Sequence, residues 1–175
     1  MKIFGLILLI LIFAAVLVYA VGARLPVNHT VSVIGVVPAS PDKVFARIAD
    51  VANGATWRPA VKSVTVLAPD DGRDHWVESL GHGQTMTFLA IHSEAPTHRE
   101  VLLDLPNGSY GGNWTYVLSP GPSPATTTLR ITETGFIYPP LYRFMMVHVF
   151  GPAHNLNQYM KDIQAAAAKP QQIPD

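Results

Sequence analysis

Cysteine is absent from this sequence of 175 residues. Disulfide bonds, thiolate nucleophiles, zinc-thiolate sites and iron-sulfur clusters are therefore excluded. The redox compartment stays open, because a chain without cysteine is compatible with either side of a membrane.

A net charge is also lacking, since 12 basic residues balance 12 acidic residues. The chain has no basic excess to attract phosphate backbones and no acidic excess to attract cationic substrates. We therefore expect no nucleic-acid partner.

Motifs that hold metals, nucleotides or a serine nucleophile are missing as well. The seven histidines form no HExxH or comparable pair of ligands. No GxGxxG pattern, phosphate-binding loop or GxSxG motif is present. We therefore expect neither a metal ion nor a cofactor.

Apolar residues, in contrast, fill the start of the chain. The run from Ile3 to Val21 carries no charge, and at about 1.5 Å per residue it covers most of a hydrocarbon core roughly 30 Å thick. We expect residues 1–23 to form a single-pass transmembrane anchor. The small residues Ala20, Gly22 and Ala23 leave a cleaved signal peptide as the alternative.

The remaining chain divides into three parts. Residues 24–28 are predicted to be a hinge, too short to let a following domain move far from the bilayer. Residues 29–168 form the expected domain, and the polar residues 169–175 an expected disordered tail. Lys2 before the apolar run and Arg24 after it lead to the hypothesis that the domain is extracytoplasmic.

The pattern within the domain predicts an α+β fold. A strand over 29–40 precedes a short helix that Ser40 caps and Pro41 begins. Six further strands, separated by turn residues, are expected at 61–67, 73–79, 84–93, 97–105, 112–119 and 125–136. A long helix follows from Pro139. A curved sheet needs an apolar element on its concave face, and this helix is the one available.

Several segments resemble one known superfamily. "PASPDKVFARIADVANGATWRPAVKSVTVL" resembles the opening of START-like proteins, also called SRPBCC proteins, of the polyketide cyclase/dehydrase and lipid-transport type. "GGNWTYVLSP", "LRITETGFI" and "PPLYRFMMVHVFG" are similar to segments of its membrane-anchored bacterial members. The resemblance implies a helix-grip fold: a curved antiparallel sheet of six to seven strands around a long C-terminal helix, two short helices after the first strand, and a cavity for an apolar ligand.

Strand alternation assigns residues to the concave face of this sheet. Arg99 shares a face with Val101, and Glu133 shares a face with Ile131. Two buried charges are costly unless they are paired, so we expect Arg99 and Glu133 to meet each other, a ligand group or water. His92 is placed on the face of Met86 and Phe88. The ligand-binding candidates are Trp57, Met86, Phe88, Arg99, Trp114, Tyr116, Glu133, Met145 and His148.

On the long helix, residues recur at three- and four-residue spacings and predict one continuous stripe that faces the sheet. The stripe consists of Leu141, Met145, His148, Pro152, Leu156, Tyr159 and Ile163. His148 in this stripe is an acid-base candidate, and Pro152 predicts a kink. By resemblance Trp57 lies beside the cavity mouth, while Arg58 is expected to be solvated above it.

Three functions remain open from the sequence. The first is membrane-tethered binding of a hydrophobic small molecule or lipid in the cavity between sheet and helix. The second is a polyketide cyclase or dehydratase that uses His148, Glu133, Arg99 and Tyr116. The third is a non-catalytic interaction module at the membrane. The oligomeric state is left open.

Overall fold

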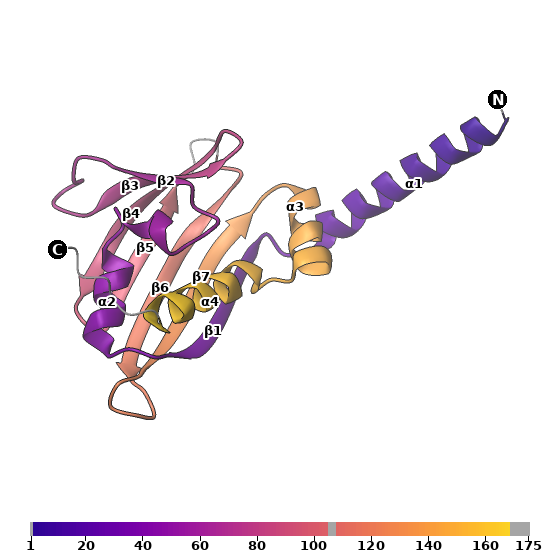
Figure 1. The fold of residues 1–175 in the computed structure, drawn as a ribbon. Helices are drawn as coiled ribbons and strands as arrows, with labels where there is room; N and C mark the ends of the chain where they lie inside the picture. The colour runs from indigo at the N-terminus through magenta and orange to yellow at the C-terminus, as the bar shows by residue number, and fades with distance from the viewer. Residues whose placement is uncertain (1, 105–107, 169–175) are drawn as a thin grey trace.

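A seven-stranded antiparallel sheet organises the computed structural model, which describes residues 2–104 and 108–168 (Figure 1). The predicted tail at 169–175 and Leu105, at the end of a predicted strand, lie outside the described residues. The strands are β1 (Asn28–Val37), β2 (Ser63–Val66), β3 (His75–Gly81), β4 (Gln84–Glu94), β5 (His98–Asp104), β6 (Tyr110–Pro120) and β7 (Thr127–Ile137).

The strand order is β1-β7-β6-β5-β4-β3-β2. Six strands therefore form a meander, and β1 joins it beside the last strand, antiparallel to β7. The two edges of the sheet are β1 and the four-residue strand β2.

The helices are α1 (Lys2–Arg24), α2 (Pro41–Ala49), the 3-10 turn η1 (Gly54–Thr56), α3 (Pro140–Met145), the π-helical turn η2 (Met146–Phe150) and α4 (His154–Ala168). As predicted, α2 follows Ser40 and begins at Pro41, and it buries Val44, Phe45 and Ile48. Proline suits the first turn of a helix because the amide that it lacks would have no partner there.

The core lies between the concave face of the sheet and α4, as in a helix-grip fold (Figure 1). Leu156, Tyr159 and Ile163 of α4 are buried against sheet residues such as Leu129 and Ile131. The opposite face of the sheet is exposed along β1. Thr30 and Ser32 on it each contact a threonine of β7, while Ile34 and Val36 farther along are apolar. The predicted fold class is confirmed.

The predicted continuous stripe on one long helix is wrong. The helical stretch ends at Phe150, Gly151 has a φ of 85°, and α4 begins anew at His154. Pro152 has no amide to continue a helix, and a positive φ at Gly151 turns the chain away from the helical path. A full break therefore replaces the expected kink, and only the α4 part of the stripe faces the sheet.

The segment before the break packs against α1 instead (Figure 1). Gly22 of α1 touches α3 so closely that a Cβ atom there would lie 2.1 Å from the Pro140 carbonyl oxygen. Arg143 of α3 is buried, and its Nε donates to the Gly22 carbonyl at 3.0 Å. Its Nη1 donates to the carbonyls of Ile137 (2.9 Å) and Tyr138 (2.5 Å). One guanidinium therefore joins the end of α1 to the end of β7.

At the β1 edge, α4 lies directly on the strand. A Cβ atom added to Gly35 would lie 2.7 Å from Sδ of Met160. Beside it, Gln164 Nε2 donates to the Val36 carbonyl at 3.0 Å. The absence of a side chain at position 35 thus sets how closely α4 approaches the sheet.

We predict that Gly35→Val lowers the free energy of unfolding by about 1–3 kcal/mol, because extra methyl groups overpack the contact with Met160. Urea unfolding followed by circular dichroism measures the change. Val36→Ile adds a methyl group on the opposite, exposed face of the same strand and should leave stability within about 0.5 kcal/mol. Equal stability of both variants would contradict the assigned role of Gly35.

Candidate functional site

Tyr159 of α4 forms the centre of an aromatic cluster beneath the helix. Its ring centroid lies 5.3 Å from Trp57, 5.6 Å from Trp114 and 5.5 Å from Tyr116. Trp57 follows η1, whereas Trp114 and Tyr116 lie on the concave face of β6. Edge-to-face and tilted contacts of this kind add to the stabilisation from burial alone.

A buried ion pair adjoins these rings. Arg58 donates from Nη1 to Oε2 of Glu78 at 3.0 Å, and Trp76 Nε1 donates to Oε1 of the same carboxylate at 3.0 Å. The Arg58 guanidinium lies over the rings of Trp57 and Tyr159, with its Cζ 5.4 and 5.8 Å from their centroids. The prediction that Arg58 covers Trp57 is therefore confirmed. The prediction that it is solvated is wrong, because Glu78 provides a partner inside.

Arg99 is a further cation of the interior, and it is 2 % exposed. It lies opposite Tyr116 in the register of β5 and β6, which confirms its predicted place on the concave face. The predicted pairing with Glu133 is wrong. Its Nη2 donates instead to Asp74 Oδ2 at 2.8 Å, and Nη1 donates to Ser93 Oγ at 3.2 Å.

Glu133 lies on the same concave face but farther along the sheet, opposite Trp114. Its Oε1 is 3.5 Å from Nε2 of His29, a residue of β1 that the sequence analysis did not select. Nδ1 of His29 is buried and has no hydrogen-bond partner among residues 2–104 and 108–168. The structure thus assembles a histidine-carboxylate pair beside the aromatic cluster.

Phe88 and Met86 of β4 extend the apolar lining. The Phe88 ring stacks on Trp76 with centroids 5.4 Å apart, and Met86 lies opposite Glu78. His92 does not share their face, contrary to prediction, because a bulge between Ala90 and His92 shifts the register. An extra residue in one strand reverses which face the following side chains occupy.

Met145 and His148 are the predicted candidates that the structure does not bring to this interior. Met145 ends α3 and His148 belongs to η2, and both precede the helix break. His148 is exposed, and its ring lies 4.9 Å from Phe144.

The sequence analysis missed Glu78 and Trp76, although a signal for them exists. The two residues are separated by one position in β3, so alternation places them on one face. A glutamate that shares a face with a tryptophan has the pattern of a buried, paired carboxylate.

Burial governs the ionisation of the two tyrosines. It raises the pKa of Tyr159 to about 12, although the neighbouring Arg58 acts in the opposite direction. Burial also raises the pKa of Tyr116 well above its ordinary value, and Tyr159 is the next cause. Burial alone would lower the pKa of Arg58, but Tyr159 and Glu78 outweigh it and raise that pKa. Both hydroxyls therefore stay protonated near neutral pH and can donate hydrogen bonds.

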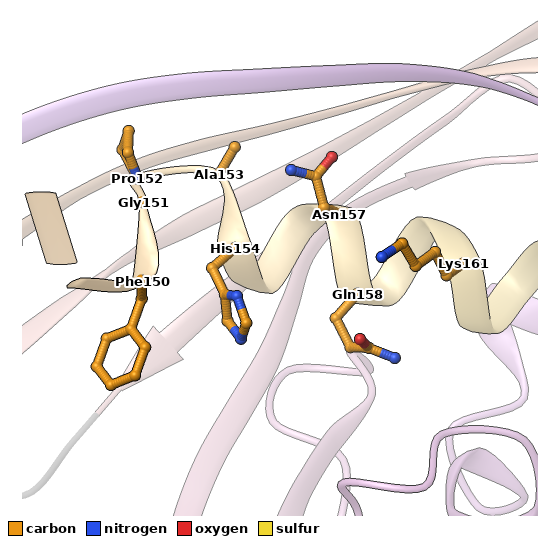
Figure 2. A pocket seen from close by; sticks show the side chains of 8 residues that line it. All are labelled: Phe150, Gly151, Pro152, Ala153, His154, Asn157, Gln158 and Lys161. Carbon is orange, nitrogen blue, oxygen red and sulfur yellow. The ribbon is translucent and has the colours of Figure 1, made fainter. Parts of the chain in front are cut away.

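Two pockets border the ends of α4. One, of about 310 Å³, is lined by residues 150–154 with Asn157, Gln158 and Lys161. Figure 2 shows the side chains of Phe150, His154 and Gln158 projecting to one side of the chain there. The other, of about 560 Å³, lies between α2 and the last turn of α4. The aromatic cluster around Tyr159 lies between these two ends of the helix.

Tyr159 should make stability sensitive to alkali. The pKa of Tyr159 in the folded chain exceeds the ordinary value of 10.0. The contribution of this difference to the free energy of unfolding is therefore complete below pH 10. It is lost as pH rises toward 12, because the unfolded chain releases the tyrosine proton at a lower pH than the folded chain does. Two pKa units correspond to about 3 kcal/mol. We predict that Tyr159→Phe reduces the fall in unfolding free energy between pH 9 and pH 12 by up to this amount, as measured by urea unfolding at each pH.

A matched control is Tyr138→Phe, which removes the hydroxyl of an exposed tyrosine and should keep the wild-type pH dependence. If Tyr159→Phe kept the wild-type dependence too, the burial of the Tyr159 hydroxyl would be refuted.

Comparisons with solved structures find the same architecture elsewhere. A START superfamily protein from Mycobacterium smegmatis matches with a TM-score of 0.61 and 18% identity, covering 79% of this chain and 97% of that one. The ZhuI aromatase/cyclase from Streptomyces sp. R1128 matches with a TM-score of 0.65 and 16% identity, over 80% and 93%. Truncated norcoclaurine synthase from Thalictrum flavum matches with a TM-score of 0.64 and 11% identity, over 83% and 96%.

At such identities the likeness concerns the fold alone. No curated protein matches the sequence. The family model described as "Polyketide cyclase / dehydrase and lipid transport" matches residues 28–155, which is most of the chain. This chain therefore belongs to the polyketide cyclase/dehydrase and lipid-transport family.

Proposed function

We propose that this protein binds a hydrophobic small molecule or lipid in the interior between the sheet and α4, while α1 tethers it to a membrane. The observation that carries the proposal is the composition of that interior. All three tryptophans of the chain, Trp57, Trp76 and Trp114, line it, together with two protonated tyrosine hydroxyls and a buried ion pair. Apolar walls with a few fixed polar groups are typical of small-molecule sites.

The polar groups define the kind of ligand. Nε of Arg58 and Nε of Arg99 are buried donors without a hydrogen-bond partner among the described residues. Such donors favour an acceptor, since an unsatisfied buried polar group is costly. The proposed ligand therefore combines an apolar body with a carboxylate, phenol or keto oxygen.

Ligand entry requires the rings to separate, because Tyr159 contacts Trp57 and Trp114 directly. Trp57 is partly buried and lies on the connection between η1 and β2. We assign it the role of the gate. Trp114, Tyr116, Arg99, Phe88 and Met86 are the proposed lining on the sheet side.

The proposed tether between the domain and a membrane is α1. Residues 3–24 form one helix long and apolar enough to cross a membrane, and its most apolar stretch is not buried in the domain. A signal sequence at this position passes the same test of length and composition. We propose the anchor because the last turns of α1 are packed against α3 and held by Arg143. The domain is proposed to be extracytoplasmic, as the flanking charges suggest.

A second candidate function is a cyclase or dehydratase, and the observation that favours it is the His29–Glu133 pair. Histidine changes protonation near neutral pH, and a carboxylate neighbour orients its ring. Glu133 also lies opposite Trp114 in the sheet, so the pair adjoins the proposed ligand interior. A carbonyl compound held there would have an acid-base group beside it.

We predict that Trp114→Ala weakens ligand binding about tenfold, equivalent to about 1.4 kcal/mol, because it removes an aromatic wall. Wild type and Trp114→Ala are each extracted at full length into native nanodiscs without detergent and analysed by native mass spectrometry. The variant should release a smaller amount of an apolar compound than the wild type. Titration with a fatty acid, a sterol and an anthraquinone, followed by intrinsic tryptophan fluorescence, gives the affinities.

Val117→Ala is the matched control, since Val117 lies on the outer face of the same strand and is exposed. It should bind like wild type. If wild type and Trp114→Ala release the same compounds in equal amounts, and no tested compound changes the tryptophan fluorescence, the binding function is refuted.

For the second candidate, we predict that Glu133→Gln lowers turnover of a poly-β-keto substrate at least about 100-fold, as expected for loss of an acid-base group, while the affinity of that substrate is unchanged. Product analysis by liquid chromatography measures turnover. Glu100→Gln, on the outer face of β5, is the control. Turnover that survives Glu133→Gln would exclude catalysis by this pair.

A further inference from the structure

Residues 138–150 carry an exposed apolar surface, which we call the α3 ridge. The ridge comprises the end of the β7 connection, α3 and η2. Its apolar side chains are 38–58 % exposed and are Tyr138, Leu141, Tyr142, Val147, Val149 and Phe150. An exposed apolar patch of this kind marks a surface that contacts another protein or a membrane.

The position of the ridge along α1 indicates what covers it. α1 is exposed over residues 3–17. From Val18 to Gly22 its residues other than Tyr19 are partly or fully covered, where α3 packs against it. At about 1.5 Å per residue, this contact occupies roughly the last 6 Å of the apolar helix. Interfacial segments insert to a similar depth, about 5–10 Å, at the boundary of headgroups and acyl chains.

The composition of the ridge fits that boundary. Tyr138 and Tyr142 combine an apolar ring with a hydroxyl that can stay wet, as tyrosines at membrane interfaces do. The sequence contains no acidic residue between Glu133 and Asp162, so nothing there repels an anionic headgroup. The one cation of the ridge, Arg143, points inward to three carbonyl oxygens and is buried.

We propose that the α3 ridge inserts into the lipid interface of the leaflet in which α1 ends. This inference rests on the proposed membrane anchor and adds a second contact with the bilayer. α3, within the ridge, packs against the last turns of α1 (Figure 1), so the lipid that surrounds α1 also covers Leu141, Tyr142 and Phe150. The α3–α1 joint then fixes the domain at one orientation, with the start of α4 at the lipid surface.

The lack of cysteine makes a direct test simple, because a single introduced cysteine has no competitor. Tyr142→Cys and Phe150→Cys each place a thiol-reactive NBD fluorophore on the ridge of the full chain. Ala14→Cys marks α1. Val66→Cys is the matched control, an exposed apolar residue of the edge strand β2. Each labelled protein is reconstituted into phosphatidylcholine vesicles that contain lipids with a nitroxide near the headgroup end or near the middle of the acyl chain.

We expect the shallow nitroxide to quench labels at 142 and 150 strongly and the deep nitroxide to quench them less. The label at position 14 should respond most to the deep nitroxide. The label at 66 should respond to neither and should be quenched by iodide in the water. Unchanged emission of the three core tryptophans before labelling verifies folding.

The outcomes separate the two proposals. If position 14 shows no lipid quenching, the membrane anchor itself fails. If position 14 is quenched while 142 and 150 behave like 66, the anchor stands and the inserted ridge is refuted. Labels at 142 and 150 that are shielded from both iodide and nitroxide, and become accessible when the protein is diluted with lipid, would assign the ridge to contact with a second copy and also refute lipid insertion.

Discussion

The contacts of one ring, that of Tyr159, determine how the parts of this domain meet. Tyr159 touches Trp114 and Tyr116 on the sheet and Trp57 on the connection after η1. Because Trp57 is held there, the next residue, Arg58, reaches Glu78 inside. A buried carboxylate without a partner would be severely destabilising. The position of α4 and the pairing of Arg58 with Glu78 therefore depend on the same ring contacts.

The sequence predicts the elements better than it predicts their partners. Alternation places Arg99, Trp114 and Tyr116 on the concave face, because a strand has a period of two whatever surrounds it. The partner of Arg99 depends on the register across several strands. Asp74, just before β3, and Ser93 of β4 bind its guanidinium, and Glu133 does not. The β-bulge before His92 cannot be recognised from the alternation of apolar and polar residues in the sequence.

The break at Gly151 and Pro152 shows a different limit. Both residues are visible in the sequence, and they do indicate an interruption. Whether the helix bends or divides depends on the surface available to its first half. Here α1 offers Gly22, whose missing side chain admits Pro140, and Arg143 donates hydrogen bonds to carbonyls at the ends of α1 and β7. A tertiary contact therefore decides a local conformation.

The cover that α4 provides for β1 matters for the proposed membrane tether. Edge strands expose backbone groups that can pair with another chain, and confinement to two dimensions raises the frequency of encounters between copies. β1 follows α1 after residues 25–27 and is the longer edge strand of the sheet. Gln164 of α4 already occupies the Val36 carbonyl, and Met160 lies against Gly35. The helix that covers the interior therefore also covers part of this edge, which opposes lateral sheet extension between copies that the proposed tether would bring together.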